Sequence, residues 1–233
     1  MPTVTRLDTR NLPAYSYADA ETYLHIPRGT LRSWVKGRTY KTKQGTRFSE
    51  PLIELPSADA KALSFANLVE AHVLRAIRVE HEVQLNQIRI ALNFISNELD
   101  YPHPLVRGDF LRTDGQSIYV EHLGQLLDAS KEGQFAIRET LEIYLTRIEV
   151  DEQGIAARLF PFLHPNRTKD EPKVIVIDPN ISFGRPTIVG TRIPTRVVAD
   201  RHDAGDSVEE LADDYGCDPK LIRVAIAYEG SAA

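Results

Sequence analysis

Cysteine, methionine and tryptophan are almost missing from this sequence, with one residue of each among 233. Because Cys217 stands alone, no disulfide can form within the chain, which fits a reducing cytoplasm. No apolar run approaches the roughly 20 residues that a membrane-spanning helix needs, and the first residues lack the apolar stretch of a signal peptide. We therefore expect a cytoplasmic protein that does not enter a membrane.

The patterns that carry enzyme chemistry are missing as well. The seven histidines are scattered, and none lies at metal-ligand spacing from another histidine or from Cys217. There is no G-x-S-x-G elbow. Five residues separate Gly184 from Gly190, whereas a phosphate-binding P-loop needs four between its glycines and a Lys after them. We expect no enzyme, no catalytic residue, no metal and no cofactor.

Charge is distributed unevenly along the chain, whose net charge is −5. Residues 1–56 carry nine Lys and Arg against five Asp and Glu. Residues 57–169 carry 12 against 16, and residues 170–233 carry seven against 12. A basic head can approach phosphates while an acidic body stays away from them. This asymmetry predicts a nucleic-acid-binding segment at the N-terminus.

Residues 1–56 predict a winged helix-turn-helix head. Ser16 can cap a short helix that runs to Tyr23, and residues 24–26 form the turn. Pro27 suits the first turn of a second helix, which Gly37 can end. Strands near 39–43 and 46–48 would flank a Gln44-Gly45 turn and make the wing. In such units the second helix enters the major groove of DNA.

Two groups of side chains in this head are candidate DNA contacts. The second helix can present its polar side to base edges, while a basic wing typically grips the phosphate backbone. Any one of these charges could simply be a solvated surface group. The ordered combination of turn, amphipathic helix and basic hairpin favours DNA binding. The helix candidates are Arg28, Thr30, Arg32, Ser33 and Lys36, and the wing candidates are Arg38, Lys41, Lys43 and Arg47.

Residues 16–37 resemble the start of the MerR-like winged-helix family, which has a Thr-Leu-Arg-x-Trp/Tyr run on its recognition helix. Here the run is Thr30-Leu31-Arg32 followed by Trp34. Pro27 stands where that family usually has a polar cap. The resemblance implies a MerR-like winged-helix fold for the head and extends into the helices that follow.

Residues 57–165 predict a helical pair followed by a mixed α/β region with hairpins. The segment 63–99 reads as two helices, and the second carries an apolar stripe at helical period: Leu85, Ile88, Leu92, Ile95 and Leu99. This stripe could be core or the seam of a dimer. Further along, we expect a turn at Asp114-Gly115, a helix over 134–146 and a hairpin around 151–154. The polar segment 166–173 predicts a linker.

Residues 174–233 predict a C-terminal helix-turn-helix domain after a strand at 174–177. Ser207 and Glu210 make a capping box, and Gly216 can end that helix. Asp218-Pro219 can begin the next helix. This second unit could contact either DNA or protein. Taken together, the elements predict an α+β fold that is mainly α.

Residues 177–229 resemble a small bacterial domain with a G-x-P-x-I-x-G-T-R-I-P signature, matched here from Gly184 to Pro194. Such domains commonly belong to antitoxins paired with PIN-like ribonuclease toxins. With its MerR-like head, the chain resembles a VapB-type antitoxin of a VapBC-like pair. The resemblance implies two partners, a cognate PIN-like ribonuclease toxin and operator DNA that the protein binds to autoregulate its operon. A homodimer is expected because helix-turn-helix proteins usually read two half-sites.

Four arginines of this domain are candidate toxin contacts. PIN-like toxins hold Mg²⁺ in a carboxylate cluster, and an antitoxin can neutralise that cluster by inserting an Arg. The candidates are Arg185, Arg192, Arg196 and Arg201. Each could instead be an ordinary surface or loop-stabilising residue, and Arg192 could be engaged by its own loop together with Thr191.

Two other function classes stay open. The chain could be a one-component MerR-like regulator that senses a small molecule through residues 101–165. It could also be an interaction scaffold with a decayed DNA-binding head, although the basic wing argues against that.

Overall fold

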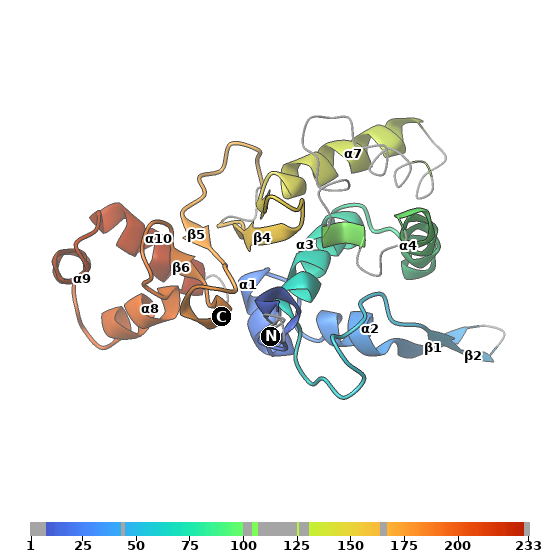
Figure 1. The fold of residues 1–233 in the computed structure, drawn as a ribbon, viewed down its shortest axis with the longest axis horizontal. Helices are drawn as coiled ribbons and strands as arrows, with labels where there is room; N and C mark the ends of the chain where they lie inside the picture. Colours follow the sequence, from blue (N-terminus) through green and yellow to red (C-terminus); the bar gives the residue numbers. More distant parts are fainter. Residues whose placement is uncertain are drawn as a thin grey trace, which may run out of the picture.

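The computed structural model describes residues 8–42, 45–99, 104–106, 125, 131–163 and 167–230. Helices dominate these ranges, and the strands there form antiparallel pairs, so the predicted α+β, mainly α class is confirmed. Figure 1 shows the winged head at the lower right, α3, α4 and α7 above it, and the C-terminal helices at the left. No helix in the described ranges is long and apolar enough to cross a membrane.

The elements follow one another in this order: η1 Thr9–Asn11, α1 Tyr17–Tyr23, α2 Thr30–Lys36, β1 Arg38–Thr42, β2 Gly45–Ser49, α3 Phe65–Glu80, α4 Leu85–Leu99, η2 Pro104–Val106, α7 Lys131–Leu145, β3 Ile148–Val150, β4 Ala156–Leu159, β5 Ile175–Val176, η3 Ser182–Gly184, β6 Thr187–Ile188, α8 Thr195–Asp203, α9 Val208–Tyr215 and α10 Pro219–Gly230.

The first helix of the head begins where its cap predicts, but the second begins later than expected. Ser16 accepts a hydrogen bond from the Asp19 amide at 3.1 Å and caps α1. The expected start of α2 near Pro27 is wrong, because Gly29 has a φ of 83° and cannot continue a helix. The Thr30 amide instead bonds to the Pro27 carbonyl in a turn, and α2 begins at Thr30.

The predicted wing is confirmed as the β1–β2 hairpin, with Arg38 opposite Ser49 and Thr42 opposite Gly45. Its turn lies one residue earlier than expected, because Gly45 pairs within the ladder and does not sit in the loop. Lys43 and Gln44 lie outside the described residues. At the base of the hairpin, Gly37 has a φ of 69°, and a Cβ there would collide with the Ser49 carbonyl oxygen. Only glycine fits this junction between α2 and the wing.

Helix α3, the first of the two helices expected in 63–99, is confirmed; it runs through the centre of the molecule (Figure 1) and most of its side chains are buried. A capping box between Ser64 and Asn67 starts it. Helix α4 follows as expected, with Ile88 fully buried and Leu85 and Leu92 packed against the core. The N-terminal half of the predicted stripe is therefore core. The side chains of Ile95 and Leu99 lie outside the described residues.

The region after α4 is described only in part. The helix expected over 134–146 is confirmed as α7, and the expected hairpin is confirmed as β3–β4, with Ile148 opposite Leu159. The expected turn at Asp114-Gly115 lies outside the described residues, as do the other residues of 107–124 and those of 126–130 in the possible sensor region. Leu159 and Ile177 exchange backbone hydrogen bonds of 3.0 and 2.8 Å. These bonds join β4 to the start of the C-terminal unit.

A buried arginine holds the chain between these two parts. Arg147 is 1% exposed and donates to the carbonyl oxygens of Phe160 at 2.9 Å and Glu171 at 2.6 Å. Its guanidinium also lies over the Phe162 ring. A buried charge is tolerated only where its donors are satisfied, and here loop carbonyls satisfy them. Arg147 therefore fastens residues 160–172 to the end of α7.

The C-terminal unit has its own core and follows its local signals closely. The Ser207–Glu210 capping box is confirmed, Gly216 ends α9 with a φ of 62°, and the Asp218 side chain bonds the Lys220 amide at the start of α10. The core gathers Leu163, Ile175, Ile188, Val198, Leu211, Ile222 and Tyr228. Helix α8, which was not predicted from the sequence, packs mainly on α10.

Candidate nucleic-acid and partner interfaces

The recognition helix α2 buries its apolar side and exposes a polar one. Leu31 and Trp34 are in the core, while Arg32 and Lys36 are exposed and Thr30 and Ser33 are half-buried. Arg28 is exposed in the turn before α2, so its expected place in the first helical turn is wrong. It still lies two residues from the N-terminus of α2, the end that reads bases in such motifs. The Ser33 hydroxyl donates to the Thr30 carbonyl at 2.7 Å.

The wing presents cations on both of its faces. Side chains alternate along a strand, so Arg38 and Tyr40 share one face with Arg47, which pairs with Tyr40. Lys41 points to the other face. All of these side chains are exposed. Lys43 lies outside the described residues. A wing of this kind offers cations to phosphates on both of its faces.

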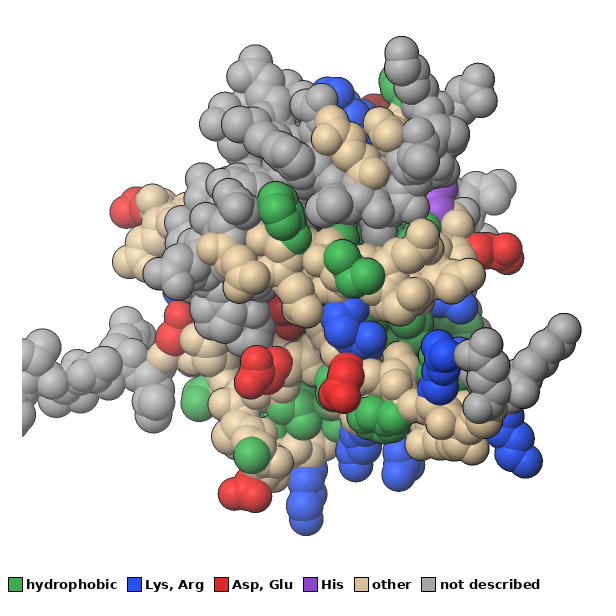
Figure 2. All heavy atoms as spheres, turned by 90° about the vertical axis from the view of Figure 1, so that its right-hand side faces the viewer, with side chains coloured by type: hydrophobic (Ala, Val, Ile, Leu, Met, Phe, Trp, Pro, Cys, Tyr) green, Lys and Arg blue, Asp and Glu red, His purple; other side chains and the backbone are tan. Residues whose placement is uncertain are grey.

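Together, α2 and the wing form a basic surface. Figure 2 shows Lys and Arg side chains along the lower edge of the face turned toward the viewer. Within the described ranges, none of the five cations Arg28, Arg32, Lys36, Arg38 and Lys41 forms an ion pair with a carboxylate of the protein. Their charges are thus available to a ligand, as expected from the composition of the head.

Two further arginines near this surface were not singled out from the sequence. Arg78 of α3 lines a cleft of about 310 Å³ together with Thr30, Ser33 and Arg38. Arg89 of α4 donates to the carbonyl oxygens of Glu50 and Pro51, just after the wing. Arg78 can add to the basic surface, whereas Arg89 fixes the wing to α4. Only the fold brings either residue to the head, since both follow it in sequence by more than 20 residues.

Buried polar contacts hold the helix-turn-helix rigid. The Glu21 carboxylate of α1 accepts a hydrogen bond of 2.9 Å from the Leu31 amide, and it thereby caps the start of α2. His25, in the turn, has a φ of 50°, and its carbonyl accepts two bonds from Arg75, at 3.0 and 3.2 Å. Arg75 also donates to the Tyr144 hydroxyl at 2.8 Å. The turn is therefore fastened to α3 and α7.

The histidines serve packing and hydrogen bonding. His72 is buried against Tyr144 and Phe162, and burial lowers its pKa to about 3. Burial also lowers the pKa of His25. His81 bonds to Thr140 at 2.9 Å. Within the part of the chain that the structure describes, no three His, Cys, Asp or Glu side chains are grouped to hold a metal ion.

The four arginines expected to contact a toxin differ sharply in how they are engaged. Arg201 pairs with Asp206 and Asp214, both at 2.6 Å, and lies over the Tyr215 ring. Arg196 pairs with Asp200 at 2.8 Å. Arg185 and Arg192 are exposed and form no ion pair with another described residue. These two arginines are the ones left with their charge unused.

The signature loop is tied together by short polar contacts. The Thr191 hydroxyl donates to the Ile188 carbonyl at 2.8 Å, as expected for a loop-stabilising role. Arg192 contributes its backbone carbonyl, which accepts from the Ser182 hydroxyl at 3.0 Å. The Arg192 guanidinium makes no such hydrogen bond to the loop, although the side chain of Arg192 was expected to help stabilise it. The Ser182 contact brings the segment around Phe183 next to Arg192.

Phe183 stands out in this loop and was not singled out from the sequence. It is 90% exposed, and both Ser182 and Phe183 adopt positive φ values, 48° and 58°, that residues with a Cβ rarely adopt. Backbone strain of this kind clusters at ligand and partner sites. We call Phe183, Arg185 and Arg192 the signature-loop patch. An apolar residue inside the loop DPNISFGRP was the only signal for it in the sequence.

The second helix-turn-helix, α9 with α10, is dominated by acidic groups. Glu209, Asp213 and Asp214 are exposed on α9, and Arg223 of α10 pairs with Glu209 at 2.8 Å. This surface would repel phosphates. Of the two possibilities left open for this unit, its charge favours contact with protein.

Comparison with family models matches two parts of the chain. Residues 13–92 match the model described as "Putative DNA-binding HTH domain", which covers the head and continues through α3 into α4. Residues 175–228 match the model described as "Protein of unknown function (DUF433)". The two matches coincide with the winged head and the C-terminal unit.

Two relatives from Mycobacterium tuberculosis align with almost the whole chain. The chain is 28% identical to "Putative antitoxin VapB45" over 93% of both sequences. It is 27% identical to "Uncharacterized protein Rv2308" over 92% of this chain and 89% of that one. The X-ray crystal structure of Rv2018 from the same organism superposes with a TM-score of 0.65 at 23% identity, covering 92% of this chain and 98% of that chain, and so shares the fold. The predicted resemblance to a VapB-type antitoxin with a helix-turn-helix head is confirmed.

Proposed function

We propose that this protein is an antitoxin that neutralises a cognate PIN-like ribonuclease toxin by direct binding and binds operator DNA to autoregulate its operon. The observation that carries the proposal is the combination, in one chain, of a basic winged helix with free cations and an end-to-end similarity to a protein named as an antitoxin. The DNA half and the toxin half depend on different surfaces and are separately testable.

For DNA, α2 enters the major groove, with its N-terminal end toward the bases. Arg28 and Arg32 read guanine through bidentate hydrogen bonds, and Thr30, Ser33 and Lys36 support them. The wing cations Arg38, Lys41, Lys43 and Arg47 grip phosphates on either side of the hairpin. The rigid anchoring of the turn by Glu21 and Arg75 supports this assignment, because a preorganised helix loses little entropy on binding.

The toxin binds at the signature-loop patch, because the side chains of this patch are exposed and two of them are cationic. The unpaired guanidiniums of Arg185 and Arg192 can form charge-assisted, bidentate bonds with the carboxylates that hold Mg²⁺ in a PIN-like site. Phe183 supplies the apolar anchor typical of an interface hot spot. Arg196 and Arg201, already paired with their own carboxylates, belong at the rim of that contact.

A homodimer completes the proposal, because two heads on one axis can read two half-sites. Helix α4 is the candidate seam: Ile90 is 64% exposed on the side of α4 away from the buried Ile88. The seam is therefore shifted from the Leu85–Leu99 stripe, whose first residues are core.

The decisive experiment mixes the purified protein with the proposed cognate PIN-like ribonuclease toxin. We expect a stable complex by mass determination and loss of Mg²⁺-dependent ribonuclease activity at equimolar ratio. Full nuclease activity and no complex at micromolar concentration would refute the proposed toxin binding. The proposed DNA binding would then still be tested by its own titration.

A further inference from the structure

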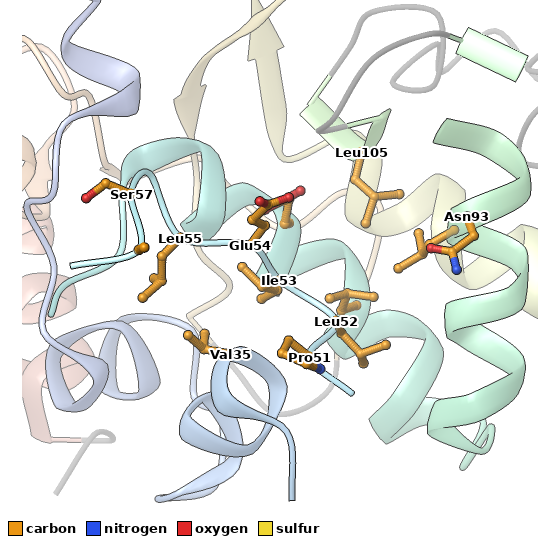
Figure 3. A pocket seen from close by; sticks show the side chains of 13 residues that line it. Val35, Pro51, Leu52, Ile53, Glu54, Leu55, Ser57, Asn93 and Leu105 are labelled. Carbon is orange, nitrogen blue, oxygen red and sulfur yellow. The ribbon is translucent and has the colours of Figure 1, made fainter. Parts of the chain in front are cut away.

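Two cavities border the recognition helix α2, and they differ in the charge that they offer a ligand. The larger, of about 670 Å³, lies between α2, the segment after the wing, α3 and α4, with Val35, Leu52 and Leu105 on its walls (Figure 3). No Lys, Arg or His stands among the described residues that line it. The smaller cleft, of about 310 Å³, is lined by two arginines, Arg38 and Arg78. Of the two, the smaller cleft is the one that can hold an anion.

Three elements build this cleft. Thr30, Ser33 and Trp34 of α2 line it, and their spacing of three and four residues places them on one side of the helix. Arg38 is the first residue of β1, and Arg78 lies in the last turn of α3. The cleft therefore lies between the recognition helix and the wing, the two elements that we expect to meet DNA.

Most of the donors that line the cleft are unused. Within the described part of the chain, the guanidiniums of Arg38 and Arg78 form no ion pair and no hydrogen bond. The Thr30 hydroxyl has no hydrogen-bond partner there either. Ser33 differs, because its hydroxyl already donates to the Thr30 carbonyl at 2.7 Å. Two cations and one hydroxyl are thus left to bind a ligand.

Neighbouring contacts fix the two arginines in place before a ligand arrives. Arg75 lies one turn before Arg78 on the same side of α3 and donates to the His25 carbonyl at 3.0 and 3.2 Å, so α3 is fastened to the helix-turn-helix. Gly37, with a φ of 69°, turns the chain from α2 into the wing and so positions Arg38. A preorganised site of this kind loses little entropy on binding.

One carboxylate lines the same cleft, that of Glu82 in the connection between α3 and α4. Glu82 is exposed, and it forms no ion pair with any other described residue. Two guanidiniums against one carboxylate leave a single net positive charge among the described residues of the lining. This balance matches the single negative charge of a phosphodiester. A carboxylate beside a phosphate repels it, so Glu82 lowers the affinity of the cleft for an anion.

We propose that this cleft seats one phosphodiester of the DNA backbone and that Glu82 limits its affinity. Arg38 and Arg78 bind the free phosphate oxygens through charge-assisted hydrogen bonds, and the Thr30 hydroxyl donates to the same group. A phosphate carries no sequence information, so the seat fixes the position of α2 on the duplex without reading bases. The inference rests on the proposed DNA binding and adds to it a contact from α3.

The test titrates the full chain, over a range of salt, on the duplex directly upstream of its gene and on a random duplex of equal length. Arg78→Ala should weaken both duplexes alike, by about tenfold, and reduce the salt dependence by about one unit. Arg78→Lys keeps the charge but not the planar fork, so it should retain the salt dependence and lose part of the affinity. Lys169→Ala, at an exposed lysine outside the head, is the control and should change neither quantity.

Glu82→Gln should act in the opposite direction. It removes the charge that repels the phosphate and keeps the size of the side chain, so both duplexes should bind about threefold more tightly. Glu152→Gln, at an exposed carboxylate between β3 and β4, is the matched control and should leave both affinities unchanged. Unfolding curves establish that each variant is folded, and the exposed position of Glu82 keeps the test valid if Arg78→Ala destabilises the protein.

Ethylation of single phosphates in the upstream duplex gives a readout that a merely structural role of Arg78 would not change. In the native complex, ethylation of the seated phosphate should block binding. With Arg78→Ala, that one phosphate in each half-site should no longer interfere, while the other contacted phosphates still do. An unchanged pattern, a loss of interference at every position, or a Glu82→Gln variant that binds no more tightly than the native protein would overturn the proposal.

The two levels of the proposal fail in different ways. A native chain that binds neither duplex would refute the proposed DNA binding itself, and the phosphate seat with it. A native chain that binds both duplexes, with Arg78→Ala binding equally well, would refute the phosphate seat alone.

Discussion

The hydroxyl of Tyr228, in the last helix, donates a hydrogen bond of 2.9 Å to the backbone carbonyl of Tyr23, at the end of α1. The ring of Tyr228 also meets the ring of His25 edge to face, with centroids 5.5 Å apart. On the same side, Gly184 of the signature loop lies so close to Tyr15 that a Cβ would collide with its hydroxyl. The DNA-binding head and the C-terminal unit are therefore one packed structure, as Figure 1 shows for α1.

Replacing Tyr228 with Phe should lower the free energy of unfolding by about 1 kcal/mol, the usual net value of one hydrogen bond. The ring and its contact with His25 remain, so the loss reports the bond to the Tyr23 carbonyl. Urea denaturation measures it. Tyr40→Phe, at an exposed ring on the wing, is the matched control, and an equal loss in both variants would contradict the assignment.

Replacing Arg32 or Arg28 with Ala should weaken binding to the operator by about 1 to 3 kcal/mol per guanine contact and weaken random DNA much less. Replacing Lys41 with Ala should weaken all sequences alike and reduce the salt dependence by about one unit. Titrations of both variants on operator and random duplexes, over a range of salt, separate the two roles. If Arg32→Ala and Lys41→Ala lose affinity with the same pattern, α2 does not read bases.

Replacing Phe183 with Ala should weaken the toxin complex by at least about 2 kcal/mol, the loss typical of a hot-spot residue. Because the ring is 90% exposed, stability in the absence of toxin should not fall. Binding titrations and thermal unfolding check the two statements. Phe135→Ala, on α7, removes a ring that is 67% exposed elsewhere and should leave the complex intact. Equal weakening by both variants would rule out a specific anchor at Phe183.

Acidification should destabilise the protein through His72. Its pKa is about 3 when folded and near 6.5 when unfolded, so between these values the unfolded chain binds the extra proton. Stability therefore rises with pH across this window and falls as pH drops from about 6.5 toward 3. Each such proton contributes a slope of about 1.4 kcal/mol per pH unit.

Urea denaturation between pH 5 and 7, where most carboxylates are already ionised, measures this slope. His72→Gln should flatten it by about one proton relative to the native protein. The half-buried His25, whose pKa is also lowered, should still contribute a smaller slope in this variant. His202→Gln, at a half-buried histidine of α8, serves as the comparison variant. An unchanged slope in His72→Gln would show that another group titrates.

The local features of this protein were predictable because their signals lie within a few residues of one another. Ser16 caps α1, Ser207 and Glu210 form their box, and the β1–β2 wing follows α2. The order of helix, turn and helix and the basic face of α2 were predictable for the same reason. Capping and turn formation depend on side chains that reach only three or four positions along the chain. A resemblance to VapB-type antitoxins could likewise be drawn from contiguous motifs.

The features that remained hidden depend on backbone conformation and on contacts that form only when the chain folds. The start of α2 is set by Gly29 and by Glu21, a carboxylate from the preceding helix. Arg201 pairs with Asp206 and Asp214, whereas Arg185 and Arg192 form no ion pair within the described ranges of the chain. Distances in the folded chain decide which of several similar arginines pairs with a carboxylate. They also decide which apolar ring stays exposed to solvent. The sequence by itself determined most of the helices, the wing and the set of candidate cations. The tertiary structure decided which of these cations are engaged by carboxylates, because ion pairs and burial require neighbours that the chain brings together only on folding.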